Sequence, residues 1–170
     1  VYNCKVKTTT TGGTSAWSAL SNAVTSGSYP GVNVALASQG GTATGSSNAG
    51  YPASNANDGE RTGGNADQLL WFDTTTVYPD WLQINFNGVK TIDRVVVVTL
   101  ADNFSSATEP TPSTAFSQYG ITEFQVQYWN GTAWLAVPGG SISANRLVMK
   151  SIGFPAVSTD RIRVVITASL

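Results

Sequence analysis

The 170-residue sequence contains no histidine and a single cysteine, Cys4. The absence of histidine removes the most common general base and the most common metal ligand in proteins. It also excludes the Ser-His and Cys-His pairs of nucleophilic catalysis. With one cysteine, the chain has no internal disulfide and no thiolate metal cluster, so Cys4 is either a free thiol or a bridge between two chains.

Charge is also scarce, because charged residues make up 11% of the chain, against about 25% in an average soluble domain. Nine Lys and Arg against ten Asp and Glu give a net charge of −1. Such a chain has no basic patch for nucleic acid or for an anionic membrane. No apolar run approaches the ~20 residues of a membrane span, so we expect no membrane insertion. The 41% of hydrophobic residues is enough for a packed core.

Residues 1–32 differ in composition from the rest of the chain. They contain a Thr/Gly-rich run at 8–15 and a Ser/Gly/Pro-containing run at 26–31, which are typical of linkers. Between them, Trp17, Leu20 and Val24 have a weak helical spacing. This segment cannot build a core of its own. We therefore predict an N-terminal arm or linker, 1–32, and one domain, 33–170.

The domain shows the pattern of strands. Residues 81–86, 124–129 and 161–166 alternate apolar and polar positions, and 91–100 is rich in β-branched residues. Asn-Gly pairs at 87–88 and 130–131 predict two tight hairpins. Two long irregular stretches, Gly40 to Pro79 and Asp102 to Gly120, predict functional loops. The expected fold class is all-β, a sandwich or barrel.

Sequence motifs for catalysis are missing as well. There is no G-x-S-x-G motif and no phosphate-binding G-x-x-x-x-G-K-[ST] loop. Glycoside hydrolysis needs only two carboxylates, but the acidic residues are scattered, although two of them could still meet in space. We therefore predict that the domain is not an enzyme.

From about Asn33 to Leu170 the chain resembles discoidin (coagulation-factor C-type) domains, and most of all the bacterial family 32 carbohydrate-binding modules. The resemblance implies an eight-stranded antiparallel jelly-roll β-sandwich that binds sugars, often of the galactose type, through loops at one end. It rests on seven short segments in the family's order, namely 33–38 as the opening strand, 51–59, 79–86, 90–95, 119–121, 129–134 and 160–164.

The resemblance also implies a structural Ca²⁺ at the loop 55–62. Calcium takes about 6–8 oxygen ligands, which a tight Asp-Gly turn can supply in part through carbonyl groups. The implied ligands are Asn55, Asp58, Glu60, Thr62 and, through its carbonyl, Ala168. The alternative is an Asx turn that only shapes the loop.

A sugar site needs an aromatic face and planar polar groups. The carbohydrate-binding candidates are Trp71, Phe72, Tyr78, Asp102 and Phe104 in the two long loops, together with Arg146. Trp81 and Trp134 match structural positions of the family, so we assign both to the core.

Two functions follow from these observations. The first is a non-catalytic, lectin-like carbohydrate-binding module of an extracellular or surface protein, with a glycan as its ligand. The alternative is a structural, self-assembling subunit, such as a surface filament or phage decoration protein, whose N-terminal arm contacts neighbouring copies. A lipid- or protein-binding adhesin would need apolar spikes beside basic residues, a pairing that the sequence does not show.

Overall fold

The computed structural model describes residues 9–10, 13–14, 31–47, 50–62, 70–73, 75–106 and 108–170. The chain divides into two units, Val1–Val32 and Asn33–Leu170. In the first unit, β1 (Thr9–Thr10) pairs antiparallel with β2 (Gly13–Thr14). Most of the predicted arm, including its Trp17 and Cys4, lies outside the described residues.

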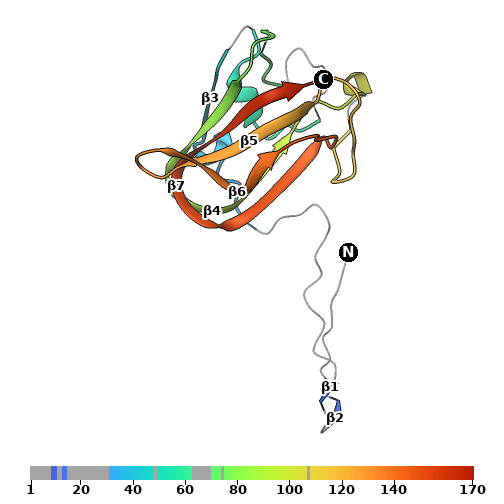
Figure 1. Cartoon of the computed structure of the whole chain (residues 1–170). Coiled ribbons are helices and arrows are strands. Elements are labelled where there is room, and N and C mark those ends of the chain that lie inside the picture. Colours follow the sequence, from blue (N-terminus) through green and yellow to red (C-terminus); the bar gives the residue numbers. More distant parts are fainter. Residues whose placement is uncertain are drawn as a thin grey trace. The chain divides into compact units, whose positions relative to one another are not determined.

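The second unit contains one five-stranded antiparallel sheet with the strand order β3-β4-β7-β5-β6 (Figure 1). Its strands are β3 (Thr42–Gly45), β4 (Asp80–Val98), β5 (Ile121–Trp129), β6 (Trp134–Ile142) and β7 (Met149–Ser169). Three short 3-10 helices lie in the connections, η1 (Ala37–Gln39), η2 (Ala53–Ala56) and η3 (Phe104–Ser106). The all-β prediction is confirmed. The described residues form five strands in this sheet where eight were expected, because two of the strands are very long.

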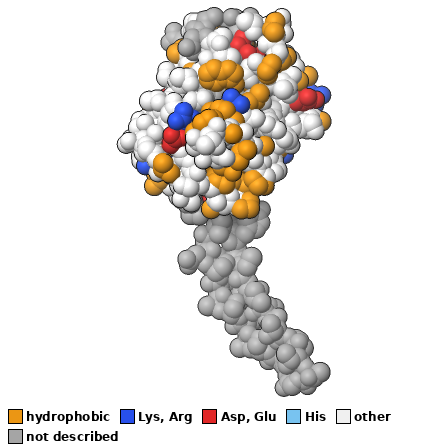
Figure 2. All heavy atoms as spheres, turned by 60° about the vertical axis from the view of Figure 1, so that its left-hand side comes forward, with side chains coloured by type: hydrophobic (Ala, Val, Ile, Leu, Met, Phe, Trp, Pro, Cys, Tyr) orange, Lys and Arg blue, Asp and Glu red, His pale blue; other side chains and the backbone are white. Residues whose placement is uncertain are grey.

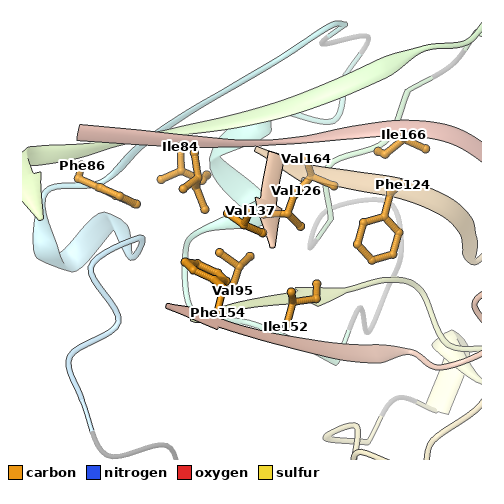
Figure 3. Packing of buried hydrophobic residues seen from close by; sticks show 11 residues of the cluster. Ile84, Phe86, Val95, Phe124, Val126, Val137, Ile152, Phe154, Val164 and Ile166 are labelled. Carbon is orange, nitrogen blue, oxygen red and sulfur yellow. The ribbon is translucent and has the colours of Figure 1, made fainter. Parts of the chain in front are cut away.

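The long strands β4 and β7 form a ribbon that supplies both layers of the core. They pair from Asp80 opposite Ile166 to Val98 opposite Met149, with a register shift between Asn85 and Lys90. The ribbon bends there, and its two halves then face each other. Figure 3 shows side chains of one half, such as Val164, pointing toward side chains of the other half, such as Ile152.

The predicted hairpin at Asn87-Gly88 is wrong. Gly88 has a φ of 76°, but Lys90 pairs with Thr159 of β7, so the chain bends instead of reversing. An Asn-Gly pair signals only a local backbone conformation, whereas a hairpin also needs the two flanking runs to pair with each other. Here both runs pair with β7.

The hairpin at Asn130-Gly131 is confirmed. Trp129 lies opposite Trp134 in the β5–β6 pair, and the amide of Asn130 donates a hydrogen bond of 3.1 Å to the carbonyl of Ala133. This hairpin closes the end of β5 opposite to Ile121.

The expected opening strand, residues 33–38, is a turn that leads into η1. Asn33 accepts a hydrogen bond of 3.2 Å from the amide of Ala35 through Oδ1, and the amide of Gly41 donates to the carbonyl of Leu36 at 3.0 Å. These local bonds compete with strand pairing. The first strand of the sheet is therefore β3, which begins at Thr42.

The core joins both halves of the ribbon to β5 and β6. Its buried members are Ile84, Phe86, Val95, Phe124, Val126, Val137, Ile152, Phe154, Ile162, Val164 and Ile166. A smaller cluster of Ala101, Phe116 and Val148 lies below the loop that follows β4. Trp81 and Trp134 are half-buried and belong to neither cluster. The reason is strand parity: with Ile84 and Phe86 turned inward, Trp81 points to the outer face.

Candidate functional site

Two long connections meet at the end of the sheet that carries the C-terminus (Figure 1). Tyr78 lies just before β4, and its hydroxyl is hydrogen-bonded to Ser169 Oγ of β7 at 2.6 Å. The amide of Leu170 donates to the carbonyl of Gly120 at 3.0 Å. We call this end, formed by the described residues of 46–79 and 99–120, the loop end.

An ion pair between Arg61 and Glu109 also joins the two connections. Both side chains are about half exposed, with 44% and 54% of their surface accessible. An exposed pair contributes little stability on its own. It nevertheless places the first connection beside the second, as the sequence prediction of a shared site requires.

Aromatic rings stand exposed at the loop end. Tyr51 and Phe72 pack edge to face with their ring centroids 5.3 Å apart, and Phe104 and Tyr119 do so at 6.0 Å. Phe72 is 49% exposed, Tyr119 55% and Tyr78 41%. Each such ring offers an apolar face with fixed orientation, which suits the apolar side of a sugar ring.

Trp71 has a different environment. It packs against the main core cluster, and its Nε1 donates a hydrogen bond of 2.9 Å to the carbonyl of Ser47. A Cβ on Gly45 would lie 2.6 Å from Trp71 Nε1, so the indole passes directly over that glycine. This ring therefore has a structural contact on one face and is only partly accessible.

Asp102 shapes the second connection through hydrogen bonds. Its carboxylate accepts from the hydroxyl and the amide of Ser117 and from the amide of Gln118, at 2.8–3.0 Å. The Ser117 hydroxyl, together with these amides, holds the pKa of Asp102 below its ordinary value of 3.8. The side chain thus remains ionised in the loop that carries Phe104. Arg146 is exposed and distant in the sequence, but its carbonyl accepts from the amide of Phe116 in this connection at 3.0 Å.

Two carboxyl groups do meet in space, although no sequence motif predicts them. Asp73 and Asp80 both lie beside one hydroxyl, because Ser46 Oγ lies 3.4 Å from Asp73 Oδ2 and 3.0 Å from Asp80 Oδ1. Burial, together with Asp73, raises the pKa of Asp80.

The predicted calcium ligands take part in local hydrogen bonds or in the sheet. Asp58 Oδ1 accepts from the amide of Glu60 at 2.8 Å, which makes an Asx turn. Glu60 Oε1 accepts from the amide of Arg61 at 3.0 Å and from the amide and hydroxyl of Thr62. The Asn55 amide donates to the carbonyl of Leu70 at 3.1 Å, and Ala168 pairs with Glu123 in the sheet.

The chemistry of these donors limits how the loop could hold a cation. The part of the chain that the structure describes contains no group of three His, Cys, Asp or Glu side chains that could hold a metal. A cation in the loop would depend on Asp58 and on carbonyl oxygens, and Glu60 would have to give up its contacts with Thr62. Calcium binding stays a prediction.

A hollow lies at the opposite end of β5, at the β5–β6 hairpin. It has a volume of about 380 Å³ and is lined by Val89, Trp129, Asn130, Gly131, Ser158, Thr159, Asp160 and Arg161. We call it the hairpin groove. Sequence reasoning missed it because its residues come from three strands whose register cannot be read from the chain.

Buried Thr159 holds the hairpin groove together. Its hydroxyl lies 2.8 Å from the carbonyls of Trp129 and Arg161. Arg161 then lies over the Trp129 ring at 5.6 Å from its centroid, and its guanidinium pairs with the Asp160 carboxylate through two bonds of 2.9 Å. The charges in this groove are thus already matched.

Comparison with known proteins places this fold in a defined class. No protein-family model and no curated protein matches the chain. Among solved structures, it is similar to chitosan-binding module 1 of a chitosanase/glucanase from Paenibacillus sp. IK-5, with 26% identity, a TM-score of 0.59, and coverage of 81% of this chain and 88% of that one. The domain has the discoidin-like β-sandwich fold of family 32 carbohydrate-binding modules.

Two further solved structures share this fold at lower identity. One is the family 32 module of Clostridium perfringens NanJ in complex with galactose, with 18% identity, a TM-score of 0.52 and coverage of 76% and 84%. The other is the family 32 module of Streptococcus pneumoniae EndoD, with 14% identity, a TM-score of 0.58 and coverage of 81% and 87%. The predicted resemblance is confirmed at the level of the fold.

Proposed function

We propose that residues 33–170 form a non-catalytic glycan-binding module that binds sugar at the loop end. The observation that carries the proposal is the likeness to chitosan-binding module 1 over 81% of the chain. The exposed rings of Phe72, Tyr78 and Tyr119 support it, because they offer the stacking surface that a pyranose needs. Asp102, Phe104 and Arg146 belong to the same proposed site.

A binding role fits the chemistry of the described residues better than catalysis. The chain has no histidine, which removes the most common general base. In the described residues, no helix is long and apolar enough to cross a membrane. We propose an extracellular or surface location, since modules of this kind occur in glycan-degrading enzymes such as a chitosanase/glucanase. The assembly alternative depends on arm residues outside the described part.

The test is a titration with chitotriose and with galactose, the sugars bound by structural neighbours. Removing an exposed ring in Phe72→Ala or Tyr119→Ala should weaken binding about fivefold or more, because about 1 kcal/mol of ring contact is lost. Leu135→Ala serves as the matched control, since Leu135 is a 41% exposed apolar residue of β6, far from the loop end.

Calorimetry on folded samples, checked by circular dichroism, gives the readout. Loss of affinity in both loop variants, with an unchanged control, supports the proposal. A folded wild-type domain that binds neither these sugars nor any member of a broad glycan panel refutes it.

A further inference from the structure

The outer face of the sheet carries a row of planar polar side chains that the sandwich core does not use. Arg163 of β7 lies opposite Gln83 of β4 on one side and opposite Gln127 of β5 on the other. Gln127 in turn lies opposite Ala136 of β6. All four positions point away from the core, because Ile84, Val126 and Val164 point into it. Arg163 therefore sits in the middle of this face.

The side chain of Arg163 is held in place by an aromatic ring and by a hydrogen bond. Its guanidinium carbon lies 4.4 Å from the centroid of the Trp134 ring. Its Nε donates a hydrogen bond of 2.6 Å to Gln127 Oε1. Gln127 in turn donates to Gln125 at 2.5 Å, and Gln125 donates to Ser141 Oγ at 2.9 Å. This chain of bonds fixes the guanidinium in one orientation.

The guanidinium has no carboxylate partner among the described residues, where the ion pairs are Arg61–Glu109 and Arg161–Asp160. Its neighbour Arg161, two positions earlier on the same face, shows the contrast, because Asp160 neutralises it through two bonds. Partial burial also lowers the pKa of Arg163 by desolvation, although an arginine stays charged in proteins. A half-buried, oriented guanidinium without a counter-charge is a ready site for an anion.

The surroundings indicate what kind of anion fits. Amide side chains flank Arg163 on both neighbouring strands, and they match sugar hydroxyls as donors and acceptors. Charged residues make up only 11% of the chain, and the face of the molecule seen in Figure 2 is mostly uncharged, with apolar side chains gathered in a band. A strongly charged phosphate cluster would need several cations, whereas one guanidinium matches one carboxylate.

We propose that Arg163, with Gln83 and Gln127 beside it and Trp134 beneath it, binds the carboxylate of an acidic sugar on the outer sheet face. This second site lies away from the loop end. It goes beyond the proposed loop-end site and rests only on the part of the proposed function that makes the domain a glycan-binding module. The shared ligand chemistry is a sugar ring that bears a carboxylate, which can come from a hexuronic acid or from a sialic acid.

The test compares acidic probes with neutral ones on the whole chain. The probes are oligogalacturonate and sialyllactose, with lactose as the neutral counterpart. We expect Arg163→Gln to weaken binding of an acidic probe about tenfold or more, which corresponds to about 1.4 kcal/mol. Arg163→Lys should lose part of that affinity, because lysine keeps the charge but not the two-pronged fork.

Two further variants make the test specific. Gln127→Glu replaces the amide whose Oε1 accepts the hydrogen bond from Arg163 Nε by a carboxylate. The new negative charge should block binding of acidic sugars, while the Arg163 guanidinium and the Trp134 ring stay in place. Arg94→Gln removes the same charge from an exposed position of β4 on the other half of the ribbon and should leave binding unchanged. The difference between oligogalacturonate and sialyllactose then identifies the source of the carboxylate.

The outcomes separate this site from the loop end. If Arg163→Gln and Gln127→Glu bind acidic probes as wild type does, or if wild type binds neither acidic probe, the outer-face site is refuted. If Tyr119→Ala weakens neutral sugars while the Arg163 variants do not, the proposed function stands without the second site. If only acidic sugars bind, and only Arg163 matters, the loop-end proposal fails and the outer-face site stands.

Discussion

Single side chains hold the loops of this domain in place. Asn57 is 4% exposed, and its amide donates to the carbonyls of Ala35 and Gly41 at 2.9 and 3.1 Å. An alanine there would leave two buried carbonyls without partners, a loss that costs about 1–3 kcal/mol for each unsatisfied group. The family-like loop 51–59 therefore contains a residue with a structural task directly beside Asp58. Sequence reasoning considered calcium or an Asx turn for the loop 55–62 and gave Asn57 no role of its own.

Gly120 packs closely against the ring of Phe116 at the loop end. A Cβ at this position would lie 2.3 Å from Cδ2 of Phe116, which is buried in the smaller cluster. We expect Gly120→Ala to lower the free energy of unfolding by about 1–3 kcal/mol through overpacking. Gly153→Ala is the control, since its added Cβ would meet its nearest atom only at 4.0 Å. Urea unfolding of both variants measures the effect, and equal stabilities would contradict this packing.

The hydrogen bonds of Asp102 make the stability of the domain depend on pH. The pKa of this carboxyl is lowered by the Ser117 hydroxyl and by backbone amides. Its contribution to stability is therefore complete above its ordinary value of 3.8 and is lost as the pH falls through the lower pKa of the folded state. Asp102→Asn should lower the melting temperature at pH 7, and the gap to wild type should shrink as the pH falls below about 3.8.

Thermal melts at pH 7, 5, 4, 3 and 2 would measure this gap. Asp93→Asn, at an exposed position of β4, is the control for the removal of one carboxylate. A gap between wild type and Asp102→Asn that stays constant over the whole range would contradict the assigned hydrogen bonds.

At the scale of elements, alternation predicted which residues point inward, but not which strands pair. Ile162, Val164 and Ile166 share a buried face, as their spacing predicts. The pairing partners of residues 81–86 and 91–98 could not be predicted, because the local signal at Asn87-Gly88 is the same for a hairpin and for a bend. Only the continuous partner strand β7 decides between them. The Trp129–Arg161 and Trp134–Arg163 contacts were missed for the same reason.

The loop 55–62 is the element in which calcium binding can be tested. If the loop binds calcium through Asp58 and carbonyl oxygens, addition of Ca²⁺ after removal of metal with EDTA should raise the melting temperature by mass action. Asp58→Asn should abolish that rise, while Asp93→Asn should keep it. A wild-type domain with the same melting temperature in EDTA and in millimolar Ca²⁺ would refute the calcium prediction.

At the scale of the whole molecule, the fold was predictable because several weak signals occur in one order. The site was less predictable. Of the aromatic candidates in the long loops, Phe72 and Tyr78 are exposed, whereas Trp71 packs on the core. A tryptophan in a loop has the same sequence signal whether it covers the core or contacts a ligand. Only the glycine beneath it, Gly45, shows which contact it makes.

The central claim is that the domain binds a glycan at its loop end. The most direct measurement is an NMR titration of the labelled domain with chitotriose and galactose. We predict the largest shift changes at Phe72, Tyr78, Phe104 and Tyr119, with residues of the hairpin groove unaffected. Saturable shift changes confined to the hairpin groove, or no change at any residue up to millimolar sugar, would contradict the account.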